Sequence, residues 1–328
     1  MATVSLIIPI YNVELYVDRC LRSVMAQSYS DIECILVDDC TPDGSMSVCD
    51  RLLAEYRGPI QFKVLHHDHN RGLSAARNTG TDAATGDYVF YLDSDDAIIP
   101  ECIEWMVKEM GKHPDTQMVC GSMDSDDRVY CAEQYTIIDD NQAIKLRYLN
   151  PKQEFPVPAW NKLIRKDFLN QHNIAFRDGI LHEDVLWTFH TIQYLSNVVM
   201  LQSPTYCYNI REDSITAKTT STAARANSLM IIFTEIANTA QEPYYSLCVY
   251  KFIERLLEWF PLSTSKNRYV FIAYIRNLLR LKQYKDAAAL AVYRAIGCFS
   301  RNNSFNTRIQ QHFTYRYHYE NQQVHSPQ

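Results

Sequence analysis

Residues 88–96 read YVFYLDSDD, a run of apolar and aromatic residues that ends in a group of carboxylates. The apolar run predicts a buried strand. Asp93, Asp95 and Asp96 follow it directly, although like charges this close repel one another. Alternate residues of an extended chain share a face, so Asp93 and Asp95 are expected to project to the same side. The pair therefore needs a cation or a proton to offset its repulsion.

Upstream of this run, short apolar segments alternate with helical patterns. Buried strands are predicted at VSLIIP (4–9), ECILV (33–37) and FKVL (62–65). Apolar side chains recur at helical spacing between and after them, at 13–24, 46–56 and 73–84. Further on, the patterns predict helices at 103–110 and 185–192 and strands at 118–120, 198–201 and 206–208, whereas 122–158 has no clear pattern. This alternation predicts an α/β fold with an open, mostly parallel sheet flanked by helices.

Polar residues follow three of the predicted strands, at the edge where open parallel sheets bind ligands. They are Tyr11-Asn12, Asp38-Asp39 and Asp93-Ser94-Asp95-Asp96. One interpretation of the last group is a divalent ion, because Mg²⁺ and Mn²⁺ often take one or two ligands from protein and the rest from phosphates and water. The other is a helix cap or a solvated turn. The strand-end position, together with a second acidic group later in the chain, favours the ion.

Two further motifs leave alternatives open. Asp38-Asp39 begins DDCTPDGS, which is typical of a turn; alternatively, one of the two accepts a hydrogen bond from a base or a ribose. Adjacent side chains of a strand point in opposite directions, so only one is expected to touch a ligand. Arg77 lies with Arg71 and Asn78 in NRGLSAARNTG. Its guanidinium, among alanines, needs a partner, either a ligand phosphate or carbonyl or an aspartate at a strand end.

A second acidic group, His182-Glu183-Asp184, stands at the start of the helix predicted at 185–192. As ordinary helix residues, Glu183 and Asp184 would interact favourably with the helix dipole. As functional residues, they would supply a general base, a carboxylate that takes a proton from an attacking hydroxyl.

The composition limits the class of protein. The chain of 328 residues is 47% hydrophobic, no apolar run is long enough to span a membrane, and no signal peptide is expected. The ten cysteines include no CxxC pair, so buried thiols in a reducing cytosol are expected. Residues 1–220 carry 32 Asp+Glu and 19 Lys+Arg, whereas residues 221–328 carry 6 and 13. An acidic body and a basic tail indicate two separate roles.

Four segments occur in an order that resembles family 2 glycosyltransferases. They are residues 4–45, NRGLSAARNTG (70–80), GDYVFYLDSDD (86–96) and HEDVLWTF (182–189). The resemblance, over about residues 3–215, implies a GT-A catalytic domain at 1–218, with a nucleotide-sugar half at about 1–96 and an acceptor half at about 97–218. An all-helical region is expected at 219–328. The resemblance also implies transfer of a sugar, commonly from a UDP-linked donor, to an acceptor hydroxyl with inversion at the anomeric carbon.

The resemblance further implies roles for individual residues. The nucleotide-sugar would be bound by Pro9, Tyr11, Asn12, Asp38 or Asp39, Arg71 or Arg77, Asp93, Ser94 and, beside the diphosphate, Arg211, with Lys162 as a second candidate. Asp95 and Asp93 would hold Mn²⁺ or Mg²⁺. Asp184, with Glu183 beside it, would be the catalytic base.

Two other functions remain as alternatives. A nucleotide-sugar-forming nucleotidyltransferase would need a Gly-rich loop after the first strand, where this sequence reads PIYNVELYV. A non-catalytic scaffold of the same fold would be expected to lack an acid in one of the two acidic groups, and both groups are intact. No QxxRW motif occurs, which argues against a processive polysaccharide synthase. The resemblance favours a glycan or lipid-linked acceptor in bacterial-type surface glycan synthesis.

The basic tail has interleaved aromatic residues, mainly at 266–319, and three interpretations compete for it. It forms a helical appendage that packs on the body or on a second subunit of a homo-oligomer, or it docks on an anionic membrane surface that presents a lipid-linked acceptor. Nucleic-acid binding is disfavoured because no recognised motif accompanies the charge. The expected location is cytoplasmic, or peripheral at the inner face of the membrane.

Overall fold

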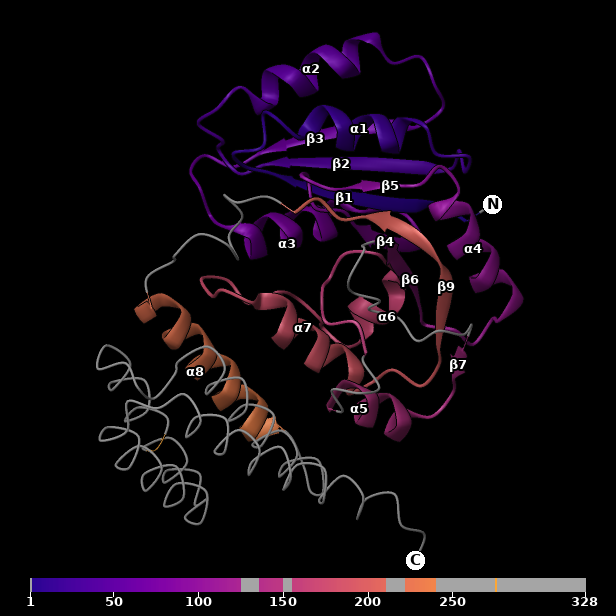
Figure 1. The fold of residues 1–328 in the computed structure, drawn as a ribbon, viewed down its shortest axis with the longest axis vertical. Coiled ribbons are helices and arrows are strands. Elements are labelled where there is room, and N and C mark those ends of the chain that lie inside the picture. The colour runs from indigo at the N-terminus through magenta and orange to yellow at the C-terminus, as the bar shows by residue number, and fades with distance from the viewer. Residues whose placement is uncertain (1, 125–135, 150–154, 211–221, 240–274, 276–328) are drawn as a thin grey trace, which may run out of the picture. The chain divides into compact units, whose positions relative to one another are not determined.

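The structure, a computed structural model, describes residues 2–124, 136–149, 155–210, 222–239 and 275 of the chain (Figure 1). The chain divides into two compact units: Met1–Gly179 with Glu183–Ser214, and Ile180–His182 with Ile215–Gln328. The expected domain boundary at residue 218 stays a prediction. The division of labour between a nucleotide-sugar half and an acceptor half is a functional statement, and it stays a prediction.

The first half of the sheet is parallel. Its strands β1 (Val4–Ile10), β2 (Ile32–Asp38), β3 (Gln61–His66) and β4 (Tyr88–Tyr91) lie in the order β3-β2-β1-β4. The helices α1 (Val17–Met25), α2 (Ser45–Glu55) and α3 (Leu73–Ala83) connect them. In Figure 1, α1 and α2 lie on one side of these strands and α3 on the other. Every strand and helix predicted in this region is present, to within a few residues at the ends.

The two faces of β1 pack against different helices. Leu6 belongs to the core cluster that also contains Leu21 of α1. Ile7 points to the opposite face, where a Cβ added at Gly80 of α3 would lie 2.4 Å from Ile7 Cγ2. The approach of α3 to the sheet is therefore so close that it requires glycine at position 80. Because a crossover helix starts at the carboxyl edge of a parallel sheet, Arg77, one turn before Gly80, is brought to that edge.

The second half of the sheet is mixed. β8 (Lys162–Arg165) pairs antiparallel with β4 and with β6 (Met118–Asp124), and β6 pairs parallel with β9 (Val198–Cys207). β5 (Ala97–Ile98) and β7 (Thr136–Ile138) both pair antiparallel with β9. The helices of this half are α4 (Cys102–Lys112), α5 (Asn141–Leu149), α6 (Lys166–Gln171) and α7 (Glu183–Ile192). The fold class predicted from the sequence, an open α/β sheet flanked by helices, is confirmed.

Within the second unit the structure describes α8 (Thr222–Thr239), which carries buried Leu229, Ile232, Phe233 and Ile236 at helical spacing. Most of the basic segment 266–319 lies outside the described residues. None of the helices that the structure does describe is both long and apolar enough to cross a bilayer.

Candidate active site

The acidic group after β4 forms a turn at the carboxyl edge of the sheet. Leu92 N–H donates to Ile7 O (3.0 Å), which extends the strand pairing, and Asp96 N–H donates to Asp93 O (3.0 Å), which closes the turn. Ser94 and Asp96 are buried, whereas Asp93 and Asp95 are half-buried. The turn therefore leaves Asp93 and Asp95, the two predicted metal ligands, accessible, and it buries Ser94 and Asp96.

Asp96 connects this turn to β9. Its carboxylate accepts hydrogen bonds from Tyr206 Oη (2.7 Å) and from Asn209 N–H (2.8 Å). Burial, together with the charges of Asp95 and Asp93, raises the pKa of Asp96 to about 8. The three carboxylates are thus close enough to influence one another, as their sequence spacing predicts. The partners on β9 were not predicted, because Tyr206 lies 110 residues from Asp96 and no local pattern connects them.

Arg77 joins the two acidic groups. Its buried guanidinium donates to Asp93 Oδ1 through Nη2 (2.7 Å) and to Glu183 Oε1 through Nη1 (2.6 Å). The ring of Phe176 lies 5.2 Å from the guanidinium carbon. A salt bridge to a strand-end aspartate was one of the two partners considered for Arg77, and it is present. The bridge also holds the start of α7 beside the Asp93–Asp96 turn, which brings two distant motifs into one site.

Asp184 follows Glu183 in the first turn of α7, and its Oδ1 accepts a hydrogen bond from Val185 N–H (2.9 Å). Burial and the charge of Glu183 raise the pKa of Asp184 to about 7, against the opposing charges of Arg77 and Lys162. Arg77 holds Glu183 in an ion pair, whereas the raised pKa of Asp184 lets this carboxyl gain or lose a proton near neutral pH. That property suits a general base.

The aspartates after β2 differ in their surroundings. Asp39 is buried, and its oxygens accept hydrogen bonds from the N–H groups of Arg71 (2.7 Å) and Gly72 (2.8 Å) and contact His67 Nδ1 (2.7 Å). Asp38 is half-buried, accepts from Thr41 N–H (2.9 Å), and lies 3.0 Å from Nδ1 of the exposed His66. Asp39 therefore fixes the loop before α3. Asp38 is the more accessible of the two.

The other predicted nucleotide-binding residues line the same edge. Pro9 is buried in β1, and Tyr11 just beyond it is 40% exposed. Asn12 has a φ of 53° and donates its N–H to Thr41 Oγ1 (2.9 Å), which ties the loop after β1 to the loop after β2. The side chain of Arg71 is exposed. Tyr11 follows Ile10, which pairs with Asp38, and the Arg71 N–H bonds to Asp39, so both residues belong to the loops at this edge.

The candidates for contact with the diphosphate were Arg211 and Lys162. Arg211 lies outside the described residues. Lys162 is buried and donates from Nζ to Pro158 O, and its charge lowers the pKa of Asp184. The structure therefore places Lys162 on the Asp184 side of the site.

A metal ion could be held at the Asp93–Asp96 turn. Among the described residues, no group of three or more His, Cys, Asp or Glu is arranged as a metal cage. The half-buried Asp93 and Asp95 nevertheless suit an ion that takes its other ligands from a diphosphate and water. The carboxylates and such an ion fit each other because the ion's positive charge would offset the repulsion from Asp95 and Asp93, which adds to burial in raising the pKa of Asp96.

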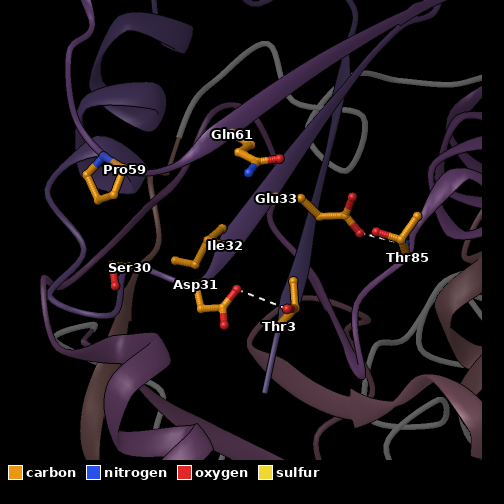
Figure 2. Close-up of a pocket in the computed structure, with 8 residues that line it drawn as sticks. All are labelled: Thr3, Ser30, Asp31, Ile32, Glu33, Pro59, Gln61 and Thr85. Atoms are coloured by element: carbon orange, nitrogen blue, oxygen red, sulfur yellow. Dashed lines mark hydrogen bonds between the residues drawn. The ribbon is translucent and has the colours of Figure 1, made fainter. Parts of the chain in front are cut away.

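A cavity of about 570 Å³ lies at the opposite, amino edge of the sheet (Figure 2). Its lining residues are Thr3, Ser30, Asp31, Ile32, Glu33, Pro59, Gln61 and Thr85. Asp31 accepts a hydrogen bond from Thr3 Oγ1 (2.9 Å), and Glu33 accepts from the N–H groups of Thr85 (2.5 Å) and Gly86 (2.9 Å). These carboxylates hold the strand ends together, and none of the predicted site residues lies here.

Comparison with known sequences places most of the chain in one family. The profile of glycosyl transferase family 2 matches residues 5–180. EpsH of Bacillus subtilis is 32% identical over 226 residues, which cover 65% of this chain and 62% of EpsH. The minor teichoic acid biosynthesis protein GgaB of the same organism is 29% identical over 227 residues, which cover 67% of this chain and 24% of GgaB. The chain therefore spans less than two thirds of the length of these relatives.

Solved structures with the same fold include two nucleotide-sugar complexes. S. aureus TarS 1–349 in complex with UDP-GlcNAc superimposes with a TM-score of 0.71 and 20% identity, covering 96% of this chain and 91% of TarS 1–349. The mannosyltransferase PcManGT of Pyrobaculum calidifontis, in complex with GDP-Man and Mn²⁺, gives a TM-score of 0.57 and 15% identity, covering 99% and 88%. At these identities the likeness concerns the fold. Taken with the family profile, which matches more than half of the chain, it leads to one assignment: the chain belongs to glycosyl transferase family 2 and has the GT-A fold.

Proposed function

We propose that this protein transfers a sugar from a nucleotide-sugar, most simply a UDP-sugar, to an acceptor hydroxyl with inversion at the anomeric carbon. The observation that carries the proposal is the Arg77 bridge, which holds Asp93 and Glu183 on one guanidinium. Asp93, with Asp95, is suited to hold a metal ion that binds a diphosphate. Glu183 precedes Asp184, the carboxyl suited to proton transfer, so the bridge brings the two groups together. The UDP-GlcNAc bound by TarS supports the choice of donor class.

The donor is expected to lie across the carboxyl ends of β2, β1 and β4. Asp38, rather than Asp39, is assigned to the base or ribose, because Asp39 already accepts hydrogen bonds from two backbone N–H groups. Tyr11 and Arg71, in the loops that follow β1 and β3, are exposed. Mn²⁺ or Mg²⁺ on Asp95 and Asp93 would supply positive charge for the leaving diphosphate when bound. The Mn²⁺ in the PcManGT complex supports the choice of ion.

Asp184 is assigned as the base. As the acceptor oxygen forms its bond to the anomeric carbon, its proton passes to the Asp184 carboxylate, and the bond to the nucleoside diphosphate breaks with its electron pair on the departing oxygen. Glu183 acts as a positioning residue, because Arg77 holds it and thereby fixes the first turn of α7. Inversion follows from a single displacement in which the acceptor and the leaving group occupy opposite faces.

The proposed pathway is surface glycan synthesis, with a glycan or lipid-linked acceptor. The name of GgaB, a teichoic acid biosynthesis protein, supports this choice. A cytoplasmic location, at the inner face of the membrane for a lipid-linked acceptor, belongs to the same proposal. It is supported by the cysteines at 20, 34, 40, 49, 102, 120 and 207, all free thiols in the described part of the chain.

The test is nucleotide release by the purified full-length chain. The protein is incubated with UDP-glucose, UDP-galactose and their N-acetyl forms in the presence of Mn²⁺, and UDP is measured. Release of UDP from at least one donor, lost on chelation with EDTA, is the expected result. Release of sugar-1-phosphate with consumption of UTP would instead identify a nucleotidyltransferase. Failure to bind or cleave any of the four donors would reject the proposed UDP-sugar donor.

A further inference from the structure

Three aromatic rings stack beside the proposed active site. Trp160 lies parallel to Tyr206, with ring centroids 4.3 Å apart and an interplanar angle of 13°. Trp160 also stacks on Tyr208, at 5.8 Å and 24°. Tyr206 and Tyr208 are two residues apart at the end of β9, so they present their rings on one side of the chain. Tyr206 is buried, whereas Tyr208 is 38% exposed and Trp160 is half-buried.

The stack is fixed to the acidic turn at its buried end. Tyr206 Oη donates to Asp96 Oδ2 (2.7 Å) and accepts from Asp93 N–H (3.3 Å). Asn209, the residue after Tyr208, donates its N–H to Asp96 Oδ1 (2.8 Å). Since these contacts join the end of β9 to the Asp93–Asp96 turn, the rings are held next to the proposed metal ligands.

The same stack is connected to the helix that carries the proposed base. Thr188 Oγ1 of α7 donates to Val157 O (2.7 Å), three residues before Trp160. Lys162, two residues after Trp160, is near enough to Asp184 for its charge to lower the pKa of that carboxyl. Trp160 is thus tied to the proposed metal-binding turn through its stacking partner Tyr206 and to α7 through Val157, between the proposed metal ligands and the proposed base.

The position in the sheet separates the stack from the expected base-binding region. Asp38 lies at the end of β2, on one side of β4 in the order β3-β2-β1-β4-β8-β6-β9-β5. Trp160 precedes β8, and Tyr206 and Tyr208 are at the end of β9, on the other side of β4. A nucleobase bound near Asp38 would therefore not contact the aromatic stack, which remains available to the acceptor.

We propose that Trp160 and Tyr208 form an acceptor subsite that stacks on a neutral pyranose ring; this inference rests on the proposed glycosyl transfer. An aromatic face carries negative potential and attracts the C–H groups on the face of a sugar ring. An acyclic polyol phosphate has no flat C–H face to offer. The carboxylates of Asp93, Asp95 and Asp184 nearby also disfavour an anionic acceptor at this point.

The test is saturation-transfer difference NMR on the full-length chain with UDP and Mn²⁺ present. The probes are methyl β-D-glucopyranoside, methyl β-D-galactopyranoside and, as an acyclic anion, glycerol 3-phosphate. We expect signals for at least one pyranoside and none for glycerol phosphate. Affinity for the pyranoside should fall by about tenfold in Trp160→Ala and by less in Trp160→Phe and Tyr208→Ala, as the loss of an aromatic contact predicts. Affinity for UDP should stay within about twofold of wild type in all three variants.

A matched control is Tyr194→Ala, because Tyr194 is also an exposed ring in a stack, with its centroid 4.2 Å from that of His172. It should leave pyranoside binding unchanged. The inference is overturned if wild type binds neither pyranoside, if Tyr194→Ala weakens binding as much as Trp160→Ala does, or if Trp160→Ala weakens UDP binding and leaves the pyranoside signal intact. UDP binding and UDP release by wild type test the proposed function separately, so the two failures can be told apart.

Discussion

The two edges of the parallel half of the sheet hold carboxylates in opposite electrostatic situations. At the amino edge, burial would raise the pKa of Glu33, but hydrogen bonds from Ser5, Thr85 and Gly86 outweigh it and lower that pKa. At the carboxyl edge, burial and neighbouring carboxylates raise the pKa of Asp184 to about 7 and that of Asp96 to about 8. The folded protein therefore stabilises the charged form of Glu33. Ionisation of Asp184 or Asp96, in contrast, lowers the free energy of unfolding.

This difference distinguishes the amino-edge cavity from the proposed active site. The amino-edge cavity in Figure 2 has room for a ligand, but Asp31 and Glu33 already accept hydrogen bonds from their own protein. At the carboxyl edge, Asp93, Asp95 and Asp96 repel one another, and the proposed cation would relieve that repulsion. The amino-edge cavity is therefore explained by hydrogen bonds within the protein, whereas the carboxyl edge holds the carboxyls whose pKa values are raised.

The largest expected effect is on turnover in Asp184→Asn. The amide has nearly the shape of the carboxylate but cannot take a proton, so sugar transfer should fall by about 10²–10⁴-fold. Affinity for UDP with Mn²⁺, measured by calorimetry, should be retained. A transfer rate equal to that of wild type would show that another group is the base.

The stability of Asp184→Asn also tests the electrostatic contrast between the two edges. Because the folded-state pKa of Asp184 is raised above its unfolded value, its charged form destabilises the folded state as pH rises through about 7. At pH 8, Asp184→Asn should therefore be at least as stable as wild type in urea unfolding. A clear loss of stability would mean that the Asp184 charge is stabilised by its surroundings, which would contradict the contrast between the two edges.

Removal of the Arg77 bridge should have the next largest effect. Arg77→Met keeps most of the side-chain volume but leaves Asp93 and Glu183 without their shared cation. We expect a loss of about 3–5 kcal/mol in the free energy of unfolding, because removing one partner leaves uncompensated buried charge. Arg22→Met is the control, since its pair with Asp18 is exposed to solvent, and it should cost far less stability than Arg77→Met. Equal effects in the two variants would show that the bridge does not hold the site together.

The pH dependence of transfer should follow Asp184. The base must be deprotonated, so kcat/KM should rise with pH up to about 7 and level off above it. Well below that value the rate should change by about tenfold per pH unit, as for a single proton. Rates measured from pH 5.5 to 8 test this, and the residual activity of Asp184→Asn should lack the acidic limb. A flat wild-type profile would argue against a base with a raised pKa.

The sequence alone is informative where the interactions are local. The strands β1 to β4 and the helices between them follow from apolar runs and helical spacing, and Asp93 and Asp95 were proposed as metal ligands from their position at a strand end. The proposal of Asp184 as the base came from the resemblance to family 2. The short strand β8 was not predicted, since it has four residues and starts with a buried lysine, Lys162.

The interactions that build the site are long-range, and no local pattern encodes them. Arg77 and Glu183 are 106 residues apart, and Tyr206 and Asp96 are 110 apart. Strand geometry predicted that only one of Asp38 and Asp39 would face a ligand. The proposal of Asp38 depends on the N–H groups of Arg71 and Gly72, more than thirty residues away, which donate hydrogen bonds to Asp39.

The smallest effect is expected at the amino edge, in Glu33→Gln. The amide oxygen can still accept hydrogen bonds from Thr85 and Gly86, but the charge that strengthens them is lost, so stability should fall by about 1 kcal/mol. Because the folded-state pKa of Glu33 is lowered, its contribution is present above the unfolded value and disappears as pH falls through the folded value. Wild type and Glu33→Gln should therefore differ in urea unfolding at pH 7 and converge in acid, with sugar transfer unchanged. A loss of transfer activity in Glu33→Gln at full stability would make the amino-edge cavity part of the reaction, and the contrast between the two edges would fail.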